Sequence, residues 1–131
     1  MKVALIKKKM EKFKKILIVD DEADIRDVVN YILTDEGYQV KELADGQNVD
    51  HAIEDSRPDV ILLDVMLGDM DGRDICRELK NAPETMAIPI IIVSATHAGI
   101  DEGKGCHADD YLLKPFDIED LIQKVNYYSA A

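Results

Sequence analysis

Residues 59–67 read Asp-Val-Ile-Leu-Leu-Asp-Val-Met-Leu, and this stretch decides how we interpret the rest of the chain. Its four apolar residues, 60–63, begin with two β-branched side chains and stand between Asp59 and Asp64. That pattern is typical of a strand buried on both faces in the middle of a parallel sheet. The carboxyl ends of such strands open into the ligand crevice of an α/β sheet. Asp64 is therefore predicted to lie where it can take part in chemistry.

Three other apolar segments end in polar residues in the same way. The segments and the polar residues that follow them are 16–19 with Asp20 and Asp21, 90–93 with Ser94, and 111–113 with Lys114. If all four strands are parallel, their ends bring three carboxylates, a hydroxyl and an amine to one edge of the sheet. Each strand end alone is unremarkable, but together they predict a site for a cation and a phosphoryl group.

Apolar residues with helical spacing separate these segments. The expected helices run from Ile25 to a stop at Gly37, from Gly46 to Asp55, through Ile75 and Leu79 before Pro83, and from Ile118 to Val125. Val28 and Ile118 are counted in their apolar faces, and residues 38–43 alternate like a short edge strand. Alternating strands and helices predict an α/β fold, a doubly wound five-stranded parallel sheet of flavodoxin-like order 2-1-3-4-5.

Length and cysteine content favour one domain in a reducing compartment. A chain of 131 residues is about one domain. Its two cysteines, Cys76 and Cys106, show neither a disulfide framework nor metal-binding spacing, and Cys76 fits a packing role. No apolar run reaches the roughly 20 residues of a membrane helix, and no signal peptide is evident. We expect a cytoplasmic protein that does not enter the membrane.

The formal net charge of −11 is unevenly distributed. Residues 1–15 carry seven lysines and one glutamate, while the remaining residues are strongly acidic. An acidic body argues against nucleic-acid binding, which needs clustered Lys and Arg. We expect a basic N-terminal extension over 1–14 and one domain over 15–131. The extension has an apolar residue at every third or fourth position. It could bury this stripe against the acidic body of its own chain or against that of a second copy, and the second case would make a homodimer.

The expected site has a definite chemistry. Carboxylates from Asp20, Asp21 and Asp64 at close range need a proton or a cation to compensate them. Mg²⁺ fits because it binds one or two carboxylates and keeps room for phosphate oxygens, and Mn²⁺ is an acceptable substitute. Lys114 adds a positive charge and Ser94 a hydroxyl donor. Asp64 is then a candidate nucleophile towards phosphorus, which would form an aspartyl phosphate.

From Lys15 to about Tyr128 the chain resembles the receiver domain of bacterial two-component response regulators. The matching motifs are Ile-Leu-Ile-Val-Asp20-Asp21-Glu22, Ile-Leu-Leu-Asp64-Val-Met-Leu, Met70-Asp71-Gly72, Ile-Val-Ser94-Ala95 and Ala108-Asp-Asp-Tyr111-Leu-Leu-Lys114-Pro115-Phe116. The resemblance implies a phosphoacceptor switch that is not an enzyme towards other substrates. Its partner would be a sensor histidine kinase or a phosphotransfer protein that donates to Asp64 from phosphohistidine.

The resemblance also implies residue roles. Asp21, Asp64 and the backbone carbonyl of Met66 would bind the metal directly, and Asp20 would act largely through water. Ser94 and Lys114 would contact the phosphoryl oxygens, and Tyr111 would reorient on activation, although it could instead be an ordinary edge-strand residue. The Lys114–Pro115 bond would be cis, as in the family.

Two departures from the family pattern stand out. Gly68 replaces the usual proline in the loop 68–72, which should make that loop more flexible. The segment 96–107 is short and has three glycines, each of which weakens a helix by up to about 1 kcal/mol relative to alanine. We therefore expect a fourth helix of no more than about two turns there.

Other functions share parts of this pattern. A phosphatase of the haloacid-dehalogenase type also uses an aspartyl nucleophile, but it needs a second Asp where this chain has Met66. A flavodoxin-like electron carrier needs a phosphate-binding loop rich in Ser, Thr and Gly, and this chain has Asp20 and Asp21 there. A receiver-like module that signals without phosphate is a third alternative. The sequence names no stimulus, kinase or downstream target.

Overall fold

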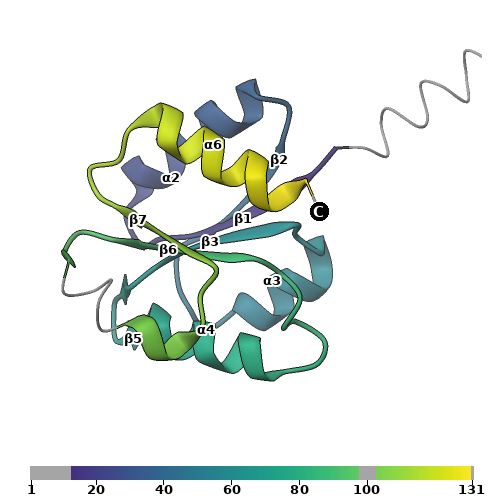
Figure 1. Cartoon of the computed structure of the whole chain (residues 1–131), viewed down its shortest axis with the longest axis vertical. Helices are drawn as coiled ribbons and strands as arrows, with labels where there is room; N and C mark the ends of the chain where they lie inside the picture. The colour runs from purple at the N-terminus through teal and green to yellow at the C-terminus, as the bar shows by residue number, and fades with distance from the viewer. Residues whose placement is uncertain (1–12, 98–102, 131) are drawn as a thin grey trace, which may run out of the picture.

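The computed structural model describes residues 13–97 and 103–130, which form a sheet with helices on both faces (Figure 1). The strands are β1 (Lys15–Val19), β2 (Gln39–Leu43), β3 (Val60–Asp64), β4 (Met66–Leu67), β5 (Met70–Asp71), β6 (Ile90–Ser94) and β7 (Asp110–Leu113). The helices are α2 (Ala23–Asp35), α3 (Val49–Ser56), α4 (Gly72–Asn81) and α6 (Ile118–Ser129), with a 3₁₀ helix at Gly103–Cys106.

The main sheet has the order β2-β1-β3-β6-β7, and every pairing in it is parallel. Because β6 and β7 are the fourth and fifth strands of this sheet, the predicted order 2-1-3-4-5 is confirmed. Helices α2 and α6 cover one face and α3 and α4 cover the other (Figure 1). All five residues of β3 and of β6 are buried, as expected for central strands between two helical layers.

The core divides into two clusters because successive strand residues point to opposite faces. Leu17 and Val19 of β1 pack towards α3 and α4, while Ile16 and Ile18 pack towards α2 and α6. Both clusters extend through β3 and β6, so the strand ends that carry polar residues are fixed from two sides. This two-sided packing positions the candidate site.

Two assignments to the apolar helix faces were wrong. Val28 is 50% exposed and Ile118 is 52% exposed. In α2, the stripe formed by Val29, Ile32 and Leu33 already covers the sheet, and Val28 lies at its edge. Ile118 is the first residue of α6, one turn before the helix reaches its buried residue Leu121. Periodicity identified both helices but not the width of the buried stripe.

The predicted loop 68–72 contains a small hairpin. Strands β4 and β5 pair in antiparallel fashion around a two-residue turn, with Gly68 at φ +61°. Glycine at the first turn position is what a type II′ hairpin turn requires, since φ is positive there. Gly72 ends this connection, and a Cβ at that position would lie 1.9 Å from the carbonyl oxygen of Asp64. Only glycine lets α4 begin so close to the end of β3.

The fourth helix expected in 96–107 falls partly outside the described residues, as does most of the basic extension over 1–14. Within the described part, the 3₁₀ helix Gly103–Cys106 packs beside α4, where Cys76 donates a hydrogen bond through its Sγ to the Cys106 carbonyl oxygen at 3.4 Å. Both cysteines are buried free thiols. Among the helices of residues 13–97 and 103–130, none combines the length and apolarity needed to cross a membrane.

Candidate functional site

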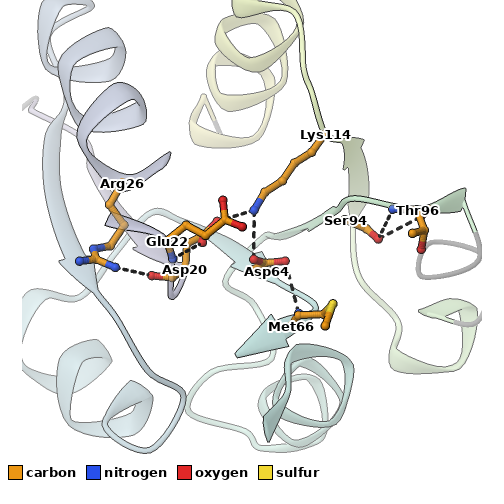
Figure 2. Close-up of polar contacts among 8 residues, drawn as sticks. All are labelled: Asp20, Glu22, Arg26, Asp64, Met66, Ser94, Thr96 and Lys114. Atoms are coloured by element: carbon orange, nitrogen blue, oxygen red, sulfur yellow. Dashed lines mark hydrogen bonds and ion pairs between the residues drawn. The ribbon is translucent and has the colours of Figure 1, made fainter. Parts of the chain in front are cut away.

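The ends of β1, β3 and β7 bring together two buried carboxylates and one ammonium (Figure 2). Asp20 is 2% exposed and Asp64 is 6% exposed. The Nζ atom of Lys114 lies 2.8 Å from Oδ2 of Asp20 and 3.0 Å from Oδ2 of Asp64, so one lysine is shared by both acids. Parallel strands of matched length place these residues at the same edge, because their register aligns the strand ends.

The electrostatics of this triad leave a surplus of negative charge. Burial raises the pKa of Asp64, and the negative charge of Asp20 raises it further, against the hydrogen bond from Lys114. Burial alone would lower the pKa of Lys114, but its hydrogen bonds to Asp20 and Asp64 raise it, so the ammonium stays charged. One positive charge faces two carboxylates, and a further cation would relieve the imbalance.

A third carboxylate completes a possible metal site. Asp20, Asp21 and Asp64 each offer an oxygen, and these oxygens lie within 4.8 Å of one another. Carboxylate oxygens are ligands that Mg²⁺ prefers, and the ion would take one or two of them and keep waters in its remaining positions. Asp21 is exposed, which leaves a path for the ion and its waters. The donor set therefore fits a hard divalent cation.

Backbone contacts hold the acids in place. Oδ1 of Asp20 accepts a hydrogen bond from the Glu22 amide at 2.9 Å, and the Asp20 carbonyl accepts one from Nη1 of Arg26 at 2.7 Å. Oδ1 of Asp64 accepts from the Met66 amide at 3.3 Å, which brings the backbone of Met66 beside the site while its side chain is 72% exposed. The metal-binding role of the Met66 carbonyl stays a prediction.

Our sequence reasoning missed Arg26, whose Nε also lies 3.4 Å from Oε1 of Glu42 at the end of β2. Acidic residues are the rule near a helix N-terminus because the helix dipole favours negative charge there. A cation in the first turns of α2 is unfavourable unless something nearby compensates it. That mismatch is the signal that could have identified Arg26.

Ser94 and Tyr111 occupy different places from the triad. The Ser94 hydroxyl is buried, donates to the Thr96 carbonyl at 2.9 Å and accepts from the Thr96 amide at 3.2 Å. Figure 2 shows these contacts to one side of Asp64, so the hydroxyl is near the site but directed at Thr96. Tyr111 lies in β7 and packs against the core cluster that includes residues of α4, away from the group formed by Asp20, Asp64 and Lys114. The Lys114–Pro115 bond is cis, as expected.

The ends of the central strands also line a pocket of about 340 Å³. Asp21, Asp64, Ser94 and Lys114 line it together with Met66. The remaining lining residues, which sequence analysis did not assign to the site, are Glu22, Val65, Arg73, Ala95 and Thr96. The pocket joins the acids, the ammonium and the serine in one cavity large enough for a phosphoryl group.

Comparison with known proteins gives a consistent result. Residues 16–126 match the family model described as the response regulator receiver domain. A candidate response regulator from Chloroflexus aurantiacus J-10-fl is 30% identical with a TM-score of 0.86, covering 92% of this chain and 100% of that one. The chemotaxis protein CheY4 of Vibrio cholerae is 30% identical with a TM-score of 0.80, covering 88% and 98%.

The receiver domain of a signal transduction histidine kinase from Syntrophus aciditrophicus is also similar. It is 30% identical with a TM-score of 0.83, and the match covers 89% of this chain and 90% of that one. The likeness therefore extends over nearly the whole of each compared chain.

Proposed function

This chain belongs to the response regulator receiver domain family, and from that premise we propose that Asp64 is its phosphoacceptor. The phosphoryl donor would be the phosphohistidine of a sensor histidine kinase or of a phosphotransfer protein. The observation that carries this proposal is the buried Asp64 carboxylate, which shares Lys114 with Asp20 and lines a pocket large enough for a phosphoryl group.

The reaction follows from the placement of these groups. A carboxylate oxygen of Asp64 forms the bond to phosphorus as the bond between phosphorus and the imidazole nitrogen breaks. Mg²⁺ held by Asp20, Asp21, Asp64 and the Met66 carbonyl would neutralise the charge that gathers on the phosphoryl oxygens. Lys114 is already within hydrogen-bonding distance of Asp64, so it can follow the negative charge from the carboxylate to the phosphoryl group.

Ser94 would transmit the change. Its hydroxyl is held by Thr96, so contact with the phosphoryl group requires it to turn away from that residue and to disturb the segment that follows β6. Tyr111, on the neighbouring strand, would then reorient towards the space that the Ser94 side chain leaves. We propose this movement as the signal read by a downstream protein.

The setting of this function is also a proposal. We place the domain over 15–131 in the cytoplasm, where its free thiols would stay reduced, with the segment 1–14 as a basic extension and a possible contact between two copies. The chain would act as a switch whose only chemistry is its own phosphorylation and dephosphorylation, and its acidic body would not bind nucleic acid.

Incubation with Mg²⁺ and a small acyl phosphate tests the proposal directly. Intact mass spectrometry should show one added phosphoryl group, and removal of the divalent cation with a chelator should prevent its addition. Failure to label at saturating donor and Mg²⁺ would contradict the proposed function.

A further inference from the structure

The pocket around Asp64 contains a second cation besides Lys114. Its lining includes the carboxylates of Asp21, Glu22 and Asp64, and its positive side chains are Lys114 and Arg73. Lys114 is already shared by Asp20 and Asp64. A phosphoryl donor brings further negative charge into a pocket where acids outnumber bases. Arg73 is therefore well placed to reduce the repulsion that an incoming donor meets.

The backbone fixes Arg73 at the edge of this pocket. The Gly72 amide donates to the Val65 carbonyl at 2.8 Å, and Gly72 itself lies directly against the Asp64 carbonyl. Arg73 is the next residue, in the first turn of α4. The start of the helix is thus anchored to the end of the strand that carries Asp64, so the position of Arg73 relative to that strand end is set by the fold.

Asp71 holds the Arg73 side chain in place. Nε of Arg73 lies 2.9 Å from Oδ1 of Asp71, and Nη2 lies 2.6 Å from Oδ2. The same Oδ1 caps α4 by accepting from the Arg73 amide at 2.8 Å. The Arg73 side chain is only 19% exposed, so the guanidinium is partly removed from water, which strengthens its interactions with anions. This hydrogen bonding lowers the pKa of Asp71, so the carboxylate stays ionised.

A guanidinium suits phosphoryl recognition. It is planar and always charged, and its five N–H donors match the spacing of phosphate oxygens. A guanidinium that lines the pocket beside Asp64 is therefore of the right chemical type to recognise a phosphoryl group.

We propose that Arg73 is a phosphate-recognition residue of this receiver, contacting oxygens of the incoming phosphoryl donor and of the Asp64 aspartyl phosphate. The inference rests on the proposed function of Asp64 and adds a second cation to it. The competing explanation is purely structural. Asp71 faces Met66 across the hairpin, so Arg73 could instead act as a brace that keeps the Met66 backbone beside the site.

Three variants separate the two explanations. Arg73→Gln removes the charge, Asp71→Asn breaks the ion pair but keeps a good helix cap and the Arg73 charge, and Arg77→Gln is the matched control. Arg77 is on the same helix, is 45% exposed and pairs with Asp74. The measurement is the initial rate of labelling by acetyl phosphate with Mg²⁺ over a range of donor concentrations, followed by intact mass.

The expected result is a loss that is largest in Arg73→Gln. Loss of one charge-assisted hydrogen bond corresponds to about tenfold, so labelling at subsaturating donor should slow by about that factor. Arg77→Gln should label as fast as the wild type. Asp71→Asn keeps the Arg73 charge but loosens its position, so it should slow labelling by less than Arg73→Gln does. Arg73→Lys, which keeps a point charge without the fork, should fall between the wild type and Arg73→Gln.

Other results would overturn the inference. Labelling of Arg73→Gln at the wild-type rate would show that the guanidinium does not contact the donor. A loss in Asp71→Asn as large as that in Arg73→Gln, or larger, would show that the ion pair acts only as a brace and that the Arg73 charge does not contact the donor. If the wild-type protein itself took up no phosphoryl group, the proposed function would fail first and this inference with it, and the wild-type sample in the same experiment distinguishes that case.

Discussion

The two edges of the central sheet both carry aspartates, but they treat them differently. At the amino edge, Asp59 accepts from the Lys15 amide at 2.8 Å, and Asp109 accepts from the Ile90 amide at 2.8 Å while Lys80 lies 2.6 Å from the same carboxylate. At the carboxyl edge, Asp20 and Asp64 share Lys114, and Asp21 lies beside them.

The difference shows what each edge is for. At the amino edge, each carboxylate accepts from the backbone at the start of the neighbouring strand, so it helps to join two strands of the sheet. The backbone bonds of Asp20 and Asp64 are instead to amides two residues further along the chain. At the carboxyl edge, acids are packed closer than their cations can balance. A buried surplus of charge weakens the fold unless a ligand compensates it, which makes that edge the natural place for a binding site.

The largest expected effect tests the carboxyl edge alone. Asp64→Asn should abolish labelling by acetyl phosphate, because the amide lacks the nucleophilic carboxylate oxygen. Asp109→Asn at the amino edge is the matched control and should still label. Intact mass gives the answer, and full labelling of Asp64→Asn at some other residue would contradict the assignment.

Mg²⁺ should stabilise the folded protein through the acids of the carboxyl edge and not through those of the amino edge. Because only the folded chain holds the three acids together, Mg²⁺ at 100 times its Kd should raise the free energy of unfolding by about 2.7 kcal/mol. Thermal melts with Mg²⁺ and with a chelator measure this. Asp109→Asn should respond like the wild type, whereas Asp64→Asn should lose most of the response. A melting temperature that does not move with metal would mean that the acids do not form the site.

The amino edge should show its structural role in the absence of metal. Asp109→Ala leaves the Ile90 amide without its acceptor and removes the carboxylate that pairs with Lys80, so it should lower the free energy of unfolding by about 2 kcal/mol. Urea titration measures the loss. Asp74→Ala, on the exposed surface of α4, is the control and should change stability little. Equal effects of the two changes would remove the structural distinction that we draw.

The smallest effect concerns pH in metal-free protein. Since burial raises the pKa of Asp64, the folded state binds a proton more readily than the unfolded chain, and ionised Asp64 destabilises the fold at neutral pH. Asp64→Asn should therefore be more stable than the wild type at pH 7. The difference in the free energy of unfolding between Asp64→Asn and the wild type should narrow as pH falls through the raised pKa of Asp64 towards its unfolded value of 3.8. A difference in the free energy of unfolding that stays constant between pH 7 and pH 4 would show that ionised Asp64 does not destabilise the fold.

Much of the fold could be predicted from local patterns in the sequence. The apolar runs that end in Asp20, Asp64, Ser94 and Lys114 predicted the sheet, its order and the edge that carries the polar residues. That reasoning works because strand and helix periodicities are local, and because parallel strands share one carboxyl edge whatever their side chains do.

Tertiary structure decided how the side chains meet. Arg26 reaches the Asp20 carbonyl, Arg73 is held by Asp71, and Ser94 binds Thr96 instead of facing Asp64. None of these contacts has a periodic signal. Their partners lie only two to six residues apart in the chain, but a rotatable side chain has several such groups to choose from, and the surrounding packing decides among them. Cys76 and Cys106, 30 residues apart, meet for the same reason. Periodicity determines which face of an element is buried. A long-range hydrogen bond, such as that from Cys76 to Cys106 or from Lys114 to Asp64, depends on distances that exist only after the layers have packed.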